Sequence, residues 1–234
     1  MKYEVILFDA DDTLFDFQSA AKNAFLRTSE SFRLPCEEEY FSVFAPINQK
    51  YWDLFSLGKI DKPTLLTARF LEYAEKIGVS FDPSGFSKSY GEKLAASSLL
   101  IDGARETLAS LAEGGIRLYL VTNGISYVQR GRLKAAGIDG FFQGLFISDE
   151  IGRPKPDAGF CEAVKKGIAA FSPDRTLVCG DSVMTDVAFG RAIGADTCLF
   201  APRGAAENSG ATYVVGKLPD LLPVAFDCRE KKAP

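Results

Sequence analysis

The sequence predicts an α/β protein in which a doubly wound parallel sheet carries an inserted α-helical cap. A short apolar strand opens the chain at residues 4–8, and a long stretch without strand signals follows. From residue 102 onward, helical periodicity alternates with short, continuously apolar runs. Such runs indicate strands that are buried on both faces, as in a parallel sheet covered by helices on each side.

The stretch that follows the first strand is expected to form the cap. We place the cap at residues 16–98 and the core at residues 1–15 and 99–234. Apolar residues recur in the cap at helical spacing. The connections near residues 15–17 and 97–102 join this helical region to the core and are expected to be hinges. Breaks that predict about four cap helices lie at Gly58, Pro63, Gly78 and Pro83.

The core elements are expected to alternate along the chain. Helices are expected near residues 103–113, 126–136, 157–168 and 184–193, and strands near residues 117–121, 145–147, 176–179, 197–200 and 213–215. Gly137 and Gly194 end two of these helices, and apolar runs such as "RLYLV" and "TLVC" mark the strands. Ligands of such sheets bind beyond the carboxyl ends of the strands. Polar residues directly after each strand are therefore the candidates for a functional site.

The composition limits the partners of the protein. The 234 residues are 47% hydrophobic and 25% charged, and a formal net charge of −4 gives no basic surface for a nucleic acid polymer. No apolar run approaches the roughly 20 residues of a membrane helix, and acidic residues follow the first apolar run too soon for a signal peptide. We therefore expect a cytoplasmic monomer or weak homodimer that acts on a small molecule and binds no membrane.

The residue inventory also limits the chemistry. Histidine is absent, which removes Ser-His-Asp and Cys-His machinery and every His-ligated metal site. The cysteines form no CxxC pair and are expected to be reduced and mostly buried; they are Cys36, Cys161, Cys179, Cys198 and Cys228. Carboxylates are therefore the leading candidates for acid-base work.

Polar side chains gather at the predicted strand ends. They are Asp9, Asp11, Asp12 and Thr13 after the first strand, Thr122, Asn123 and Gly124 after the second, Lys155 in "GRPKPD", and Asp181, Ser182 and Asp186 in "GDSVMTD". In a doubly wound sheet these loops converge at one edge. Several carboxylates make an all-oxygen site for a hard cation, most plausibly Mg²⁺. A lysine and a hydroxyl suit a phosphoryl group beside the cation, and a carboxylate nucleophile suits a histidine-free phosphotransferase.

The segments "DADDT", "VTNG", "RPKPD" and "GDSVMTD", in this order and spacing, resemble the four motifs of the haloacid dehalogenase (HAD) superfamily. That superfamily also inserts a helical cap just after the first motif, so the resemblance covers the whole chain. It implies that Asp9 is the nucleophile and Asp11 the general acid/base. Asp12 is expected to face away from the site.

The resemblance also assigns the remaining strand-end residues. Thr122 and Lys155 correspond to the pair that positions the phosphoryl group, and Asn123 is expected to bind phosphate with them. The implied Mg²⁺ ligands are Asp9, Asp11 through its backbone carbonyl, Asp181 and Asp186, the last directly or through a metal-bound water. The implied activity is hydrolysis of a phosphomonoester through an aspartyl-phosphate.

Three other activities use similar residues. A receiver domain of a signalling pathway uses a similar acidic cluster, but it has about half this length and carries its phosphorylated Asp after the third strand. A 2-haloacid dehalogenase needs no second acid, so Asp11 favours phosphate chemistry. A phosphomutase keeps both aspartates and a similar cap, so this activity remains an alternative. A phosphatase would release the phosphoryl group as free phosphate, whereas a mutase would return it to the sugar.

Short cap segments extend the resemblance to a substrate class. The opening "FDADDTLFDF" and the cap segments "INQKYW", "LGKI" and "TARF" are similar to those of pyrimidine 5′-nucleotidases. A base needs a flat apolar surface and polar donors, which Phe17, Asn48, Trp52 and Arg69 could supply. Helix packing and a solvated arginine are the alternative interpretation of these four residues. Sugar phosphates and phosphoglycolate are the alternative substrates.

Overall fold

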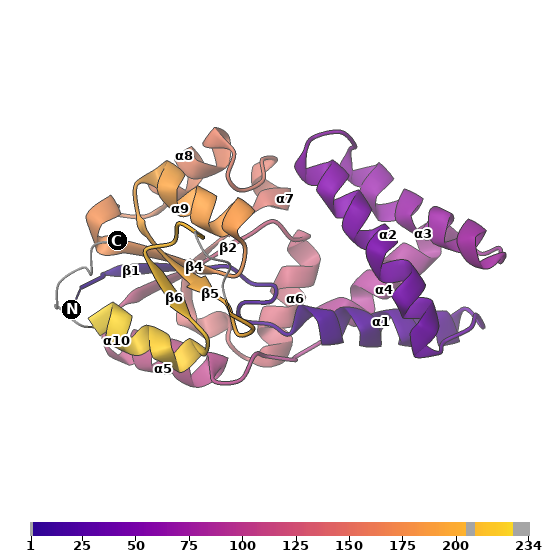
Figure 1. Cartoon of the computed structure of the whole chain (residues 1–234), viewed down its shortest axis with the longest axis horizontal. Coiled ribbons are helices and arrows are strands. Elements are labelled where there is room, and N and C mark those ends of the chain that lie inside the picture. Colours follow the sequence, from indigo (N-terminus) through magenta and orange to yellow (C-terminus); the bar gives the residue numbers. More distant parts are fainter. Residues whose placement is uncertain (1, 205–208, 227–234) are drawn as a thin grey trace. The chain divides into compact units, whose positions relative to one another are not determined.

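The computed structural model describes residues 2–204 and 209–226. The chain divides into two compact units: a core unit, Met1–Asp16 with Ser98–Pro234, and a cap unit, Phe17–Ser97 (Figure 1). The cap unit is the helical region predicted after the first strand. That each unit is a separate domain with the predicted boundaries stays a prediction. Cys228 and the tail after Asp227, expected to be frayed, lie outside the described residues.

The core unit is built on a six-stranded sheet in the order β3-β2-β1-β4-β5-β6. The strands are β1 (Val5–Phe8), β2 (Arg117–Thr122), β3 (Phe142–Ile147), β4 (Thr176–Gly180), β5 (Asp196–Phe200) and β6 (Tyr213–Val215). Each pairs with its neighbours in parallel, and β1 lies between β2 and β4, with Leu7 opposite Tyr119 and Val178. The carboxyl ends of β1, β2 and β4 therefore lie together, as predicted.

Helices cover both faces of the sheet, which confirms the doubly wound class. They are α5 (Ala104–Glu113), α6 (Ser126–Ala136), α7 (Ser148–Ile151), α8 (Ala158–Gly167), α9 (Ala188–Ile193) and α10 (Leu221–Phe226). Alternate residues of β1 point to opposite faces. Ile6 and Phe8 join the apolar cluster that contains Leu108 of α5, while Val5 and Leu7 join the cluster of α8 and α9.

The cap unit consists, within the described residues, of α1 (Phe17–Ser31), α2 (Glu38–Ser56), α3 (Lys62–Ile77) and α4 (Pro83–Ala95). Asp61 caps α3 by accepting a hydrogen bond from the Thr64 N–H at 2.9 Å, and Gly78 ends that helix in the left-handed conformation (φ 70°). Aromatic rings fill the space between the helices. Phe44 stacks on both Phe25 and Phe70, with ring centroids 4.7 and 5.0 Å apart. This ring cluster, together with other buried apolar residues, forms the interior of the cap unit.

The structure differs from the predicted elements in a few places. The helix predicted near 184–193 begins with a π-helical turn, Val183–Val187, before α9. Strand β3 begins three residues earlier than predicted, and α7 and α10 were not predicted. No helix among residues 2–204 and 209–226 is both long enough and apolar enough to cross a membrane.

Candidate active site

Asp9 lies directly beyond the central strand β1. Its backbone N–H continues the β-ladder by donating to the Cys179 carbonyl at 2.9 Å, and its residue surface is 7% exposed. The Thr13 hydroxyl donates to Asp9 Oδ2 at 3.4 Å, and Lys155 Nζ donates to Oδ1 at 2.6 Å. The backbone of the sheet therefore fixes this carboxylate, with a cation on one oxygen and a hydroxyl on the other.

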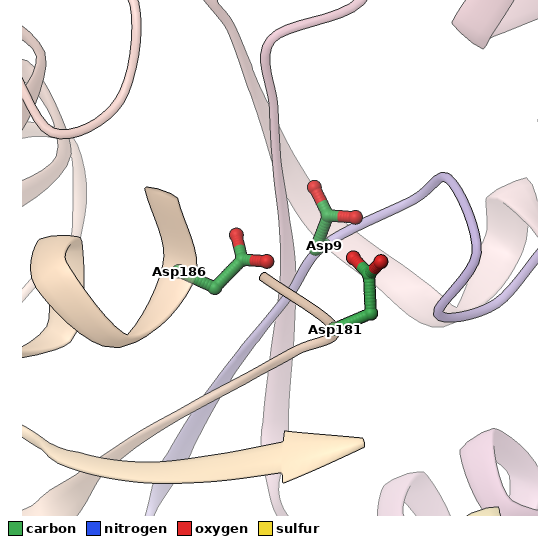
Figure 2. Close-up of side chains that lie close together, drawn as sticks. All are labelled: Asp9, Asp181 and Asp186. Carbon is green, nitrogen blue, oxygen red and sulfur yellow. The ribbon is translucent and has the colours of Figure 1, made fainter. Parts of the chain in front are cut away.

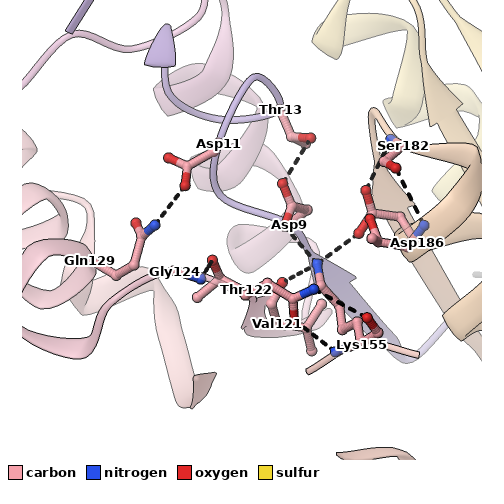
Figure 3. A network of polar contacts seen from close by, with 12 residues as sticks. Asp9, Asp11, Thr13, Val121, Thr122, Gly124, Gln129, Lys155, Ser182 and Asp186 are labelled. Carbon is pink, nitrogen blue, oxygen red and sulfur yellow. Dashed lines mark hydrogen bonds and ion pairs between the residues drawn. The ribbon is translucent and has the colours of Figure 1, made fainter. Parts of the chain in front are cut away.

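Lys155 reaches the carboxyl end of the sheet from the loop between α7 and α8. Its ammonium donates to Asp9 Oδ1 at 2.6 Å, to Asp186 Oδ1 at 2.7 Å and to the Val121 carbonyl at 2.8 Å (Figure 3). An ammonium has three N–H donors, so this set uses all of them. Burial by itself would lower the pKa of Lys155, but the charges of Asp186 and Asp9 outweigh burial and raise it. Lys155 is therefore a fixed positive charge between two carboxylates.

Three carboxylates converge beyond β1 and β4. One oxygen from each of Asp9, Asp181 and Asp186 lies within 4.8 Å of the others (Figure 2). Burial and the neighbouring carboxylates raise the pKa of Asp9 well above its usual value, although Lys155 acts in the opposite direction. Burial and the charges of Asp186 and Asp12 raise the pKa of Asp181 to about 7. One lysine does not balance three acids, and an all-oxygen donor set of this kind fits Mg²⁺.

The position of Asp186 depends on its own loop. The Ser182 N–H donates to Asp186 Oδ2 at 3.0 Å from the start of the π-helical turn. Gly180 lies directly under the Asp186 side chain, where an added Cβ would come within 2.5 Å of the Asp186 Cβ. Glycine at residue 180 therefore lets the carboxylate pass over the end of β4 to reach Lys155.

Thr122 is the last residue of β2 and Asn123 follows it, and the structure gives them different contacts. The Thr122 hydroxyl oxygen accepts from the Gly124 N–H at 3.1 Å, which leaves its O–H free to donate. The Asn123 side-chain amide pairs with the backbone of Lys155: its Nδ2 donates to the Lys155 carbonyl at 3.1 Å, and its Oδ1 accepts from the Lys155 N–H at 2.7 Å. The predicted phosphate contact of Asn123 stays a prediction, whereas its side chain holds the lysine loop.

Asp11 has its side-chain partners on α6. Its carboxylate accepts from Gln129 Nε2 at 2.7 Å and pairs with Arg132, and Figure 3 shows it directed toward Gln129 rather than toward Lys155. Asp12 adopts the left-handed conformation (φ 56°). Its charge contributes to the raised pKa of Asp181, and the direction of its side chain, away from the site, stays a prediction.

The four predicted substrate residues lie in the cap unit. Arg69 and Asn48 come together: Arg69 Nη1 donates to Asn48 Oδ1 at 2.6 Å, and the guanidinium lies 4.7 Å from the Phe70 ring centroid. Arg69 is 4% exposed, so the alternative of a solvated arginine is wrong. Trp52 is half-buried against Phe55, and Phe17 is half-buried at the start of α1.

Sequence reasoning missed two residues that contact the site, Gln129 and Arg132. Thr13 and Ser182 were among the strand-end residues, but their contacts were not predicted: the Thr13 hydroxyl donates to Asp9, and the Ser182 backbone N–H donates to Asp186. A signal for the two α6 residues was present. Both are polar, yet their spacing places them on the helix face of the apolar Val128, Leu133 and Ala136. A polar pair on a buried helix face needs a partner, and Asp11 is that partner.

Comparisons with known proteins agree with this geometry. The family of haloacid dehalogenase-like hydrolases matches residues 3–194. The chain is 35% identical to the pyrimidine 5′-nucleotidase PynA of Streptococcus pneumoniae, across 99% of this chain and 97% of that protein. It is 30% identical to the pyrimidine 5′-nucleotidase YjjG of Escherichia coli, across 94% of this chain and 97% of that protein. The magnesium-bound crystal structure of the HAD hydrolase YfnB from Bacillus subtilis has a TM-score of 0.89 at 31% identity, covering 97% of this chain and 100% of that one. The chain belongs to the haloacid dehalogenase-like hydrolase family.

Proposed function

We propose that this hydrolase is a Mg²⁺-dependent phosphatase that uses Asp9 as its nucleophile. The observation that carries the proposal is the pairing of Asp9 with a buried cation, Lys155, beside two further carboxylates at the end of the central strand. A nucleophilic carboxylate and a phosphate dianion repel each other. Positive charge must therefore lie beside both of them as they approach. Lys155 supplies one such charge, and the acidic triad is suited to hold another.

The residues around Asp9 divide the work of the reaction. Asp9 attacks phosphorus in line, and the bond to the leaving oxygen breaks as Asp11 gives that oxygen a proton. The free O–H of Thr122 holds an equatorial phosphoryl oxygen, and the positive charge of Lys155 offsets the negative charge that gathers on these oxygens. Asp11 then takes a proton from the water that opens the aspartyl-phosphate. Mg²⁺, held by Asp9, Asp181, Asp186 and the Asp11 carbonyl, would mask the repulsion between Asp9 and the phosphate.

The substrate we propose is a pyrimidine nucleoside 5′-monophosphate. Two relatives that match nearly the whole chain are pyrimidine 5′-nucleotidases. We assign the base to the cap unit, where Asn48 and Arg69 carry polar groups and the half-buried Trp52 carries a flat ring, the features that a base requires. Hexose phosphates and phosphoglycolate are the competing substrates, and phosphomutase activity is the competing reaction.

The test is a panel of phosphate esters compared by kcat/KM with wild type, Asp9→Asn and the exposed control Asp139→Asn. We expect UMP, dUMP or dTMP to be cleaved better than purine monophosphates and sugar phosphates, with free phosphate released steadily. Asp9→Asn should lose at least about three factors of ten in rate, because the covalent route is gone. Retention of more than about a tenth of the activity would overturn the nucleophile assignment. A preference for hexose phosphates or phosphoglycolate would overturn only the substrate class. Return of the phosphoryl group to the sugar would indicate a mutase.

A further inference from the structure

We propose that Gln129 and Arg132 are positioning residues for Asp11, and that Gly124 makes room for Gln129 to reach it. The inference rests on the proposed function, in which Asp11 gives a proton to the leaving oxygen. It adds three residues outside the strand-end acids and the lysine, all in the segment that follows β2.

The contacts hold both oxygens of the Asp11 carboxylate. Gln129 Nε2 donates to Oδ2 at 2.7 Å, and Arg132 Nη1 pairs with Oδ1. Residues three apart on a helix lie on one face, so α6 presents the amide and the guanidinium side by side. Gln129 is 1% exposed and Arg132 is fully buried, whereas the Asp11 side chain is 30% exposed. The anchors therefore lie inside the protein, and the group that they hold reaches solvent.

The anchors are themselves fixed. The guanidinium of Arg132 lies 4.2 Å from the ring centroid of Phe15, a buried residue of the same loop that carries Asp11. The start of α6 is tied to α7, where Asp149 Oδ2 accepts from the Ser126 N–H at 3.0 Å. The bidentate pair of Arg130 with Glu150, at 2.8 and 2.9 Å, makes a second tie. Side chains with so little freedom hold a carboxylate in one orientation.

The position of Gln129 explains why the second motif, "VTNG", ends in a glycine, Gly124. An added Cβ at residue 124 would lie 2.8 Å from Gln129 Cγ and 2.9 Å from its Cδ, and still closer to Nε2. Any larger residue would therefore push the amide of Gln129 away from Asp11. Gly124, which follows Thr122 and Asn123, thus leaves the space in which Gln129 reaches Asp11, the proposed proton donor.

The orientation suits an in-line reaction. The leaving oxygen lies on the far side of phosphorus from the attacking oxygen of Asp9. A proton donor for that oxygen must stand apart from Asp9, although only one residue separates the two in sequence. In Figure 3 the Asp11 side chain is directed toward Gln129, away from the Asp9–Lys155 pair. The α6 anchors hold it there.

The test compares two esters of similar size whose leaving groups differ in their need for a proton. Nitrophenolate leaves as a stable anion, whereas a benzyl alkoxide must be protonated as it leaves. We expect Gln129→Met, Arg132→Met and Gly124→Ala to lower kcat/KM for benzyl phosphate at least about tenfold more than for 4-nitrophenyl phosphate. The matched control is Lys134→Met, which also replaces a cation by methionine, at an exposed site of the same helix, and should leave the ratio of the two substrates unchanged.

Two further measurements sharpen the test. On an Asp11→Asn background, Arg132→Met should cause no further selective loss, because no proton donor remains to be positioned. Should Arg132→Met fail to fold, the milder Gln129→Met and Gly124→Ala carry the comparison. Equal losses for both esters, or no loss, would overturn the positioning role. The proposed function is tested separately on the same substrates: an Asp9→Asn variant that turns over either ester would overturn it, whereas an inactive one leaves the positioning test valid.

Discussion

At the scale of single residues, the site is an arrangement of charges around one buried lysine. Lys155 is 3% exposed and separates Asp9 from Asp186, so neither carboxylate faces the other without a cation between them. Breaking a buried ion pair by removing one partner usually costs about 3–5 kcal/mol, because the other charge stays buried. The charge of the same side chain is proposed to offset the charge on the phosphoryl oxygens, so its loss should affect both stability and rate.

Lys155→Met tests this double role, because methionine keeps most of the apolar stem and removes the charge. We expect kcat/KM to fall by about a hundredfold to a thousandfold, the usual effect of losing one electrostatic contact to the transition state. We also expect Lys155→Met to melt at a lower temperature than wild type in EDTA, and we expect Mg²⁺ to reverse part of this decrease. Lys166→Met is the control, since Lys166 is an exposed lysine at the end of α8. Undiminished activity in Lys155→Met would show that the "RPKPD" loop has only a structural role.

At the scale of elements, the loop after β4 aims Asp186 at the lysine. Glycine at residue 180 leaves room for this path, and Asp186 itself lies in the π-helical turn Val183–Val187. A π-helical turn inside a helix is uncommon and is frequently found at functional sites. Here it places the Asp186 carboxylate back over the end of its own strand, where the Ser182 N–H holds it.

Gly180→Ala should displace the Asp186 carboxylate and weaken Mg²⁺ binding by about tenfold to a hundredfold. Mutations of residues that support metal ligands commonly have effects of this size. Calorimetric titration of Mg²⁺ and the Mg²⁺ dependence of activity measure the effect. Gly216→Ala is the matched control, because a Cβ added at residue 216 meets no atom within 4 Å and its backbone needs no left-handed conformation. Equal Mg²⁺ affinity in the two variants would show that Asp186 tolerates the methyl group.

The strand-end residues could be predicted because they depend on local sequence. Asp9, Thr122 and Asp181 each follow an apolar run, and parallel strands bring such ends together whatever the rest of the chain does. The role of the Asn123 side chain could not be predicted in this way, since it depends on a loop 32 residues away. The partner of Asp11 lies 118 residues away on α6. The π-helical turn escaped prediction because periodicity does not distinguish it from the α-helix that follows.

At the scale of the whole molecule, we expect the acidic site to couple folding to pH and to Mg²⁺. The folded chain raises the pKa of Asp9 well above its usual value and that of Asp181 to about 7. Without a cation, the folded state therefore binds protons more tightly than the unfolded state does. The stability that these protons supply is present at low pH and is lost as the pH rises through about 7 for Asp181.

We therefore expect the metal-free protein to melt at a lower temperature at about pH 8 than at about pH 5.5, with EDTA present throughout. Mg²⁺ should raise the melting temperature more at the higher pH, because a cation that binds the folded state competes there with fewer protons. Asp181→Asn should reduce both the pH effect and the Mg²⁺ effect. A Mg²⁺ effect that is equal at both pH values would contradict the coupling.

The two connections of the cap unit to the core are paired before they part. Phe15 and Leu100 form an antiparallel bridge, with the Ile101 N–H on the Leu14 carbonyl at 2.9 Å and the Asp16 N–H on the Leu99 carbonyl at 3.2 Å. Of the segments predicted to be hinges, residues 15, 16 and 99–101 are thus tied to each other. When the two ends of an inserted region lie side by side, the region can be removed or replaced without disturbing the core, because a short turn can close the gap. In such an architecture the two units can be inherited separately. On the proposed function, in which the cap unit recognises the base, new substrate preferences can then arise by exchange of residues 17–97 without rerouting a single strand.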